Sequence, residues 1–334
     1  GVDWEVVNPE DPWSNIGYWG DHQIIYLLKL LESLDRHDPA ALGAMLGRDV
    51  FSYADVPYRI KPYADLLADP RATIVFDTER AARIEERVGT RGADGKLVTG
   101  PAGEIHHANL FEKLLVPALA KLSNLVPDAG IWMNTQRPEW NDANNALGGG
   151  GVSVVTLCYL RRYLAFLSGL LERLDTEDLP VACEVADWFE GIESVLADHS
   201  DQLGEYRFDP RARKRMMDAL GGVYSAYREK VYAAGFTGRN RLPLHRATAL
   251  CRTALSFLDR DVASNRRDDG LHHTYNLLEF AADGSAVEVR RLPVMLEGQV
   301  AALSSGVPDP AESLGMLETL FASDLYRADQ KSFM

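Results

Sequence analysis

The chain has 334 residues, of which 46% are hydrophobic, so it is long and apolar enough to bury a large core. Its formal charge of -14 excludes a typical nucleic-acid-binding protein, because such proteins gather Lys and Arg on one face. We expect no membrane span, because Arg161 and Arg162 interrupt the most apolar stretch. The first residues lack a basic start followed by an apolar run, which favours a cytoplasmic protein.

Helical periodicity, with apolar residues three and four apart, recurs along the chain. The expected helices are 24–31, 110–122 with Pro117 as a kink, 153–174, 179–199, 210–234, 245–259, 294–304 and 310–321. The basic run 207–215 is interpreted as the solvated start of one of them. The three cysteines lie far apart in apolar helical stretches, so we expect buried thiols and no disulfide framework.

Strand patterns are sparse. The stretch 73–76 is short, and 286–292 after the Asp283-Gly284 turn is typical of one arm of a β-hairpin. Long irregular connections at 49–63, 91–107 and 128–151 separate the expected helices, and loops of this length usually build a site. These features predict a mainly α fold.

Helix pairs joined alternately by short turns and long loops predict an (α/α)6 toroid, the six-hairpin glycosidase type, with inner helices around a cavity. A complete ring needs twelve helices, and the eight expected here are fewer. We therefore expect one helical-toroid domain over 1–334, incomplete and a fragment of a longer protein, with a short β-hairpin.

The segment 132–145 has the highest density of polar and aromatic residues. Cleavage of a glycosidic bond needs a carboxylic acid near the leaving oxygen, an aromatic platform for the sugar face, and polar groups that fix hydroxyls. Glu139 and Asp142, Trp140, and Arg137 with Asn141 supply these groups. Repulsion between two carboxylates three residues apart would raise one pKa toward that of a general acid. The alternative is a loop whose carboxylates cap the following helix.

The sequence Glu139-Trp140-Asn141-Asp142-Ala143-Asn144-Asn145, before a glycine run and a long apolar helix, resembles the Asp-Trp-Asn-Asp-Gly-Met-Asn loop of the cellobiose phosphorylase family. The resemblance implies that Asp142 is the general acid and that Trp140 contacts the sugar. It also leaves Glu139 as an alternative acid or a partner that tunes Asp142. Ala143 and Asn144 depart from the Gly and Met of the family.

A second segment, 16–22, supports the resemblance. It contains Trp19 and Asp21 just before an apolar helix, as an aromatic and acidic segment does in that family. The resemblance implies that Asp21 holds sugar hydroxyls and that Trp19 lies beneath the sugar ring. The alternative is that Asp21 is only the N-cap of the helix that follows.

The family binds phosphate through a His and a Thr-Gly-Gly type loop, which cannot be placed here; 271–276 is the nearest segment. Water and inorganic phosphate therefore both remain open as the attacking co-substrate. Inverting hydrolysis also needs a second carboxylate, for which Glu297 and Glu279 are candidates. His273 and Tyr275 are candidate sugar-hydroxyl contacts, or else they mark a capped helix boundary.

Adjacent histidines point apart on a helix, so we expect no metal site, and no cofactor motif is visible. The function that we expect is a glycoside hydrolase or phosphorylase that acts on an oligosaccharide or glycoside and uses no cofactor. The alternative is a non-catalytic helical toroid domain that binds carbohydrate or protein.

Overall fold

The computed structural model describes residues 21–70, 72–100, 102–133, 149–205 and 207–334, with backbone only at 21–23. All eight expected helices are present in it. The α-helices are α1 (Asp21–His37), α2 (Pro39–Met45), α3 (Tyr63–Ala68), α4 (Thr78–Arg91), α5 (Leu110–Leu122), α7 (Val154–Glu172), α8 (Cys183–Asp198), α9 (Pro210–Ala234), α10 (Leu244–Ser264), α11 (Leu296–Ser305) and α12 (Pro310–Ala322). Two short 3-10 helices are η1 (Gly92–Lys96) and η2 (Ser200–Gly204).

Five antiparallel strands form a curled sheet in the order β11-β10-β7-β6-β5. These strands are β5 (Leu125–Val126), β6 (Gly130–Trp132), β7 (Gly151–Ser153), β10 (Tyr275–Phe280) and β11 (Val287–Arg291). Four two-stranded sheets pair β1 (Phe51–Ser52) with β4 (His107–Ala108), β2 (Tyr58–Ile60) with β3 (Ile74–Phe76), β8 (Asp178–Ala182) with β9 (Arg239–Pro243), and β12 (Tyr326–Arg327) with β13 (Ser332–Phe333). The expected hairpin at 286–292 and the strand at 73–76 are confirmed as β10–β11 and β3.

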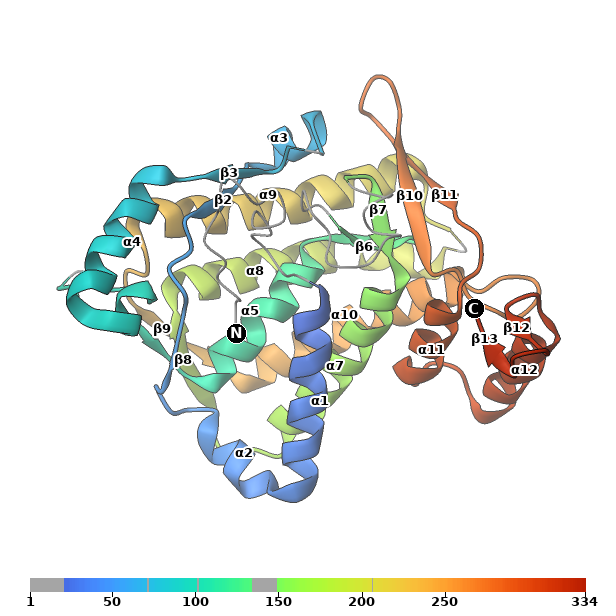
Figure 1. Cartoon of the computed structure of the whole chain (residues 1–334), viewed down its shortest axis with the longest axis horizontal. Helices are drawn as coiled ribbons and strands as arrows, with labels where there is room; N and C mark the ends of the chain where they lie inside the picture. The colour runs from blue at the N-terminus through green and yellow to red at the C-terminus, as the bar shows by residue number, and fades with distance from the viewer. Residues whose placement is uncertain (1–20, 71, 101, 134–148, 206) are drawn as a thin grey trace.

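The expected mainly α toroid is wrong. The described part of the chain is 57% helix and 17% strand, which makes the fold mixed α/β. Figure 1 shows the sheet beside one end of a body of packed helices, with the β10–β11 hairpin projecting from it. The strands β5, β6 and β7 escaped prediction because they have two or three residues each and every one of these residues is buried. A strand buried on both faces shows no alternation of apolar and polar residues.

The sheet lies between two hydrophobic clusters. Ile131 packs in the larger cluster, which fills the space among α1, α5, α7, α8, α9 and α10. The next residue, Trp132, packs in the smaller cluster, together with Leu66 of α3 and Met217 of α9. Successive side chains of a strand point to opposite faces, so each face of the sheet has its own core.

The helix α7 is the centre of the larger cluster, and it contacts α1, α5, α10 and α11. Within the described residues it is the one helix long and apolar enough to cross a membrane, but 67% of that window is buried inside the protein. Ser153 caps its start by accepting a hydrogen bond from the Thr156 backbone N–H (3.0 Å). Its apolar surface is therefore used in the core. Cys158, on α7, is buried as expected, and so is Cys251, but the expectation is wrong for Cys183, which is only partly buried at the start of α8.

Three helices, α2, α3 and α4, were not expected. The helix α4 buries only Ile84 and is polar over most of its length, so it has few large apolar residues that could mark it as a helix. Its start is nevertheless well defined, because the Asp77 carboxylate accepts a hydrogen bond from the Arg80 backbone N–H (2.9 Å). Polar surface helices of this kind are stabilised by caps and ion pairs more than by a buried face.

Candidate functional site

The helices α1 and α7 run side by side in the same direction. The Arg162 guanidinium donates to both carboxylate oxygens of Glu32, at 2.6 and 2.9 Å. One turn earlier, the Lys29 ammonium lies 5.9 Å from the centre of the Tyr159 ring. Both pairs are 130 residues apart in the chain, as 162 minus 32 and 159 minus 29 show. Carried back along α1, these pairs place its start toward the end of α7 that follows β7, while its other end lies far from the sheet (Figure 1).

The helix α11 begins at the same place. Near its C-terminal end, the Ser305 carbonyl accepts a hydrogen bond from Arg161 of α7 (3.0 Å). At its other end, Gly298 packs so closely on Thr274 that no side chain would fit there. The Thr274 carbonyl in turn accepts from the backbone N–H of Val154, the first residue of α7 (2.9 Å). The starts of α7 and α11, each with a partial positive charge, therefore meet, and α1 begins toward the same end of the helix body.

Two of the predicted site residues meet at this end. The Tyr275 hydroxyl donates a hydrogen bond to the Glu297 carboxylate (2.9 Å). Tyr275 is buried on β10, and Glu297 lies in the first turn of α11, where the helix dipole favours a negative charge. Tyr275 begins a strand, so it does not lie at the capped helix boundary that was its alternative. The structure therefore holds one carboxylate, with a phenol as its hydrogen-bond donor, beside the starts of α1, α7 and α11.

The segment with the predicted acids joins two strands at the same sheet. Residues 134–148 connect β6 to β7, and the strands on either side are held together by the Trp132 indole N–H donating to Gly149 (2.8 Å) and the Met133 N–H donating to Gly151 (2.9 Å). Six predicted site residues lie outside the described residues: Trp19, Arg137, Glu139, Trp140, Asn141 and Asp142. Asp21 begins α1, and its contact with a sugar remains a prediction.

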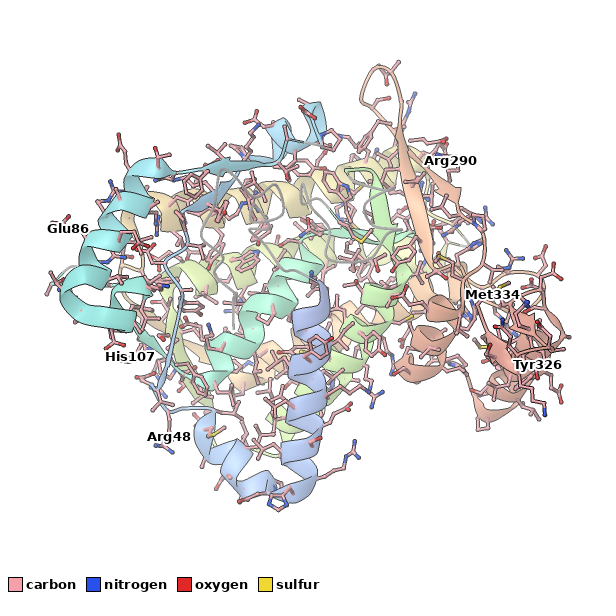
Figure 2. The ribbon with its side chains drawn as sticks, in the orientation of Figure 1. Arg48, Glu86, His107, Arg290, Tyr326 and Met334 are labelled. Carbon is pink, nitrogen blue, oxygen red and sulfur yellow. The ribbon has the colours of Figure 1, made fainter. Side chains whose placement is uncertain are left out.

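The structure does not bring His273 to Glu297. His273 lines a cavity of about 830 Å³ with Arg291 and Arg267, and its ring Nδ1 lies 3.3 Å from the Leu292 carbonyl oxygen. Glu279, the second candidate base, is half exposed on β10 and pairs with Arg290 of β11 at 2.9 Å. Figure 2 labels Arg290 on this hairpin. Glu297 is therefore the candidate base that the geometry favours.

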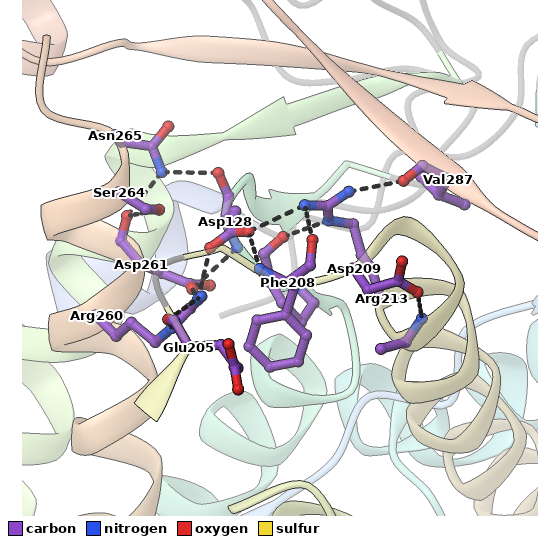
Figure 3. Close-up of polar contacts among 12 residues, drawn as sticks. Asp128, Glu205, Phe208, Asp209, Arg213, Arg260, Asp261, Ser264, Asn265 and Val287 are labelled. Carbon is purple, nitrogen blue, oxygen red and sulfur yellow. Dashed lines mark hydrogen bonds and ion pairs between the residues drawn. The ribbon is translucent and has the colours of Figure 1, made fainter. Parts of the chain in front are cut away.

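A buried ionic network around Asp128 was missed by the sequence analysis (Figure 3). One Asp128 carboxylate oxygen accepts from the Arg213 guanidinium (3.0 Å) and from the Phe208 N–H (2.7 Å), and the other accepts from Arg260 (2.5 Å). Asp128 has a positive φ of 64°, a conformation that Asp tolerates better than most residues. The expectation of a solvated helix start at 207–215 is wrong for Arg213, which is 5% exposed. Arg213 lies on the side of α9 that faces the β5–β6 turn. No pattern in the local sequence indicates this contact.

Asp261 gives the network a pH dependence. One of its carboxylate oxygens accepts from the Asp128 backbone N–H (3.0 Å), while the other is buried without a partner among the described residues. Burial, and next the charge of Asp128, raises the pKa of Asp261 to about 7. A carboxyl whose pKa is raised by folding stabilises the folded state below its unfolded pKa of about 4, and this contribution is lost as the pH rises through 7.

We therefore expect the Asp261→Asn substitution to raise the free energy of unfolding, relative to the parent, progressively between pH 4 and pH 7. The difference in the free energy of unfolding between variant and parent grows by about 1.4 kcal/mol per pH unit. The reason is that the folded parent binds one proton at Asp261 that its unfolded state has released, and Asn binds none. Urea unfolding of both proteins at several pH values checks this. Stability curves that stay parallel over this range would contradict the raised pKa.

No protein-family model matches the chain, and no curated protein matches it significantly. The described residues contain no group of three His, Cys, Asp or Glu side chains that could hold a metal ion. The resemblance of 16–22 and 139–145 to the cellobiose phosphorylase family thus remains a prediction. It has to be weighed by the geometry around Glu297 and by experiment.

Proposed function

We propose that the protein cleaves a glycosidic bond of an oligosaccharide or glycoside by general acid catalysis with inversion. The observation that carries the proposal is the position of Glu297. This carboxylate, hydrogen-bonded by Tyr275, lies at the end of the helix body where β7 and α1 begin. The strand β7 follows the segment that contains Glu139 and Asp142, so elements far apart in sequence are anchored near one carboxylate.

In the proposed reaction, the Asp142 carboxyl donates its proton to the glycosidic oxygen as the bond from this oxygen to the anomeric carbon breaks. Water attacks the anomeric carbon from the opposite face and gives a proton to Glu297. Inorganic phosphate, as the alternative nucleophile, attacks without needing this base. Inversion requires the two carboxyl groups to be roughly 6.5 to 9.5 Å apart, which leaves room for the water.

The other predicted residues bind the sugar in this proposal. Trp140 and Trp19 stack on its faces, because a pyranose presents an apolar face to an aromatic ring. Asp21, Arg137 and Asn141 hold its hydroxyl groups. Tyr275 is a positioning residue, since its hydroxyl is engaged with Glu297. His273 takes no part, because it lines the arginine-rich cavity with Arg291.

A screen of the whole chain tests this function. We expect turnover of at least one substrate from a panel of α- and β-linked disaccharides and nitrophenyl glycosides. Each substrate is assayed with and without inorganic phosphate. Proton NMR of the fresh products shows whether the anomeric configuration inverts, and separates a free sugar from a sugar phosphate. Binding of panel members without any turnover would overturn catalysis and favour the non-catalytic carbohydrate-binding alternative.

A further inference from the structure

The arginine-lined cavity is separate from the proposed active site. It opens where the β5–β6 turn, the segment before α9, the C-terminal end of α10 and β11 meet. On β10, Asn276 points toward this side, where its amide donates to the Asn265 side chain (3.0 Å). Its neighbour Tyr275 points to the opposite face, toward Glu297. A ligand in the cavity would therefore not touch the Glu297 carboxylate.

Positive charge gathers in this cavity although the whole chain is acidic. Five guanidinium groups line it, from Arg207, Arg213, Arg266, Arg267 and Arg291. Four carboxylates also line it, and two of them pair with arginines of the cavity, while Arg266 pairs with Glu312 (2.7 Å), which lies outside the lining. Asp128 accepts from Arg213, and Asp269 accepts from both the Nε and Nη2 groups of Arg267 at 2.8 to 3.1 Å. The other two, Asp268 and Glu288, are exposed.

Arg291 is a cation of this cavity whose hydrogen-bond acceptors among the described residues are all uncharged. Its guanidinium donates to the Asn265 amide oxygen and to the Ser264 carbonyl (3.3 Å), and both acceptors are neutral. In the described ranges no carboxylate lies within ion-pair distance of it. Burial lowers the pKa of Arg291 to about 10, and the charge of Asp128 offsets part of this shift, so Arg291 stays charged at neutral pH. Burying part of such a cation destabilises the folded protein through loss of hydration, unless a counter-ion lies near it.

We propose that this cavity binds a small phosphate monoester, with the Arg291 guanidinium as its main contact. The planar guanidinium fork matches the oxygens of a phosphate, and a dianion balances more than one of the surrounding cations. The volume of about 830 Å³ exceeds what inorganic phosphate fills and lies within the range of small-ligand sites. Arg207 and His273 lie on its walls and contact the same ligand. The inference does not depend on the proposed glycosidase activity.

Calorimetric titration of the whole chain with glycerol 3-phosphate, glycerate and glycerol separates phosphate, carboxylate and neutral ligands of similar size. We expect glycerol 3-phosphate to bind more tightly than glycerate, and glycerol not to bind. Arg291→Gln is expected to weaken phosphate binding by about tenfold or more, because it removes a charged hydrogen-bond donor. Arg290→Gln is the matched control, since Arg290 precedes it on β11 and pairs with Glu279. Its affinity should stay within about twofold of the parent.

Equal affinities for glycerate and glycerol 3-phosphate, or equal losses in the two variants, would overturn the proposal. So would the absence of binding at millimolar ligand. A second measurement needs no variant and so does not depend on folding of Arg291→Gln. In the parent protein, glycerol 3-phosphate should slow the reaction of phenylglyoxal with Arg291, as followed by peptide mass spectrometry. An unchanged rate of modification at Arg291 would equally contradict the assignment.

Discussion

Replacing Asp142 with Asn is expected to lower glycoside turnover by about 10² to 10⁴-fold, the usual contribution of a general acid. Asn has nearly the shape of Asp but no proton of suitable acidity, so the leaving oxygen would depart as an unstable alkoxide. Substrate affinity should change little, because Trp140 and the hydroxyl contacts are retained. Initial rates and a separate binding titration measure the two quantities on one preparation.

The leaving group provides a sharper readout than the rate alone. A dinitrophenyl glycoside needs little protonation to depart, so we expect Asp142→Asn to lose much less activity on it than on a disaccharide. Glu139→Gln is the matched control from the same segment, and it should keep most of the activity on both substrates. If Glu139→Gln instead shows the substrate-dependent loss, the general acid is Glu139 and the assignment to Asp142 is wrong.

The largest effect on stability is expected from Asp128→Asn, at about 3–5 kcal/mol in the free energy of unfolding. Arg213 and Arg260 both pair with this carboxylate, and their side chains are 6% and 11% exposed. Removing the charge leaves two guanidinium groups in a poorly hydrated place with only neutral acceptors and Asp261. Asn has the size of Asp and tolerates a positive φ equally well, so backbone strain does not contribute to the change in the free energy of unfolding.

Reversible urea unfolding measures this change. Asp187→Asn is the matched control, because Asp187 also forms an ion pair, with Lys230 at 2.7 Å, but both of these side chains are about half exposed. Exposed ion pairs contribute about 1 kcal/mol or less, so the control should unfold close to the parent. Similar losses in the two variants would mean that the Asp128 network does not stabilise the fold as the structure indicates.

The helices were predictable because the information that forms them is local. The expected helix 210–234 coincides with α9, which has Pro210 in its first turn, an Asp209 side chain that caps its start, and Gly235 with a positive φ after its end. The short strands were not predictable, because β5 to β7 exist only through pairing with each other and with β10. Their residues are buried on both faces of the sheet, so the local pattern does not distinguish them from loop or helix.

The same distinction applies to the candidate active site around Glu297 and to the ionic network around Asp128. Sequence alone identified Glu297 and Tyr275 as separate candidates and marked the acids of 139–142, because residue type decides which chemistry is available. Only the tertiary structure decided that Tyr275 hydrogen-bonds Glu297, that His273 lies elsewhere, and that Arg213 is buried against Asp128. The two hydrogen bonds join residues 22 and 85 positions apart, and the place of His273 depends on which face of the sheet its side chain occupies. Burial and pairing across such separations depend on how the elements pack together, which hydrophobic periodicity along the chain does not record.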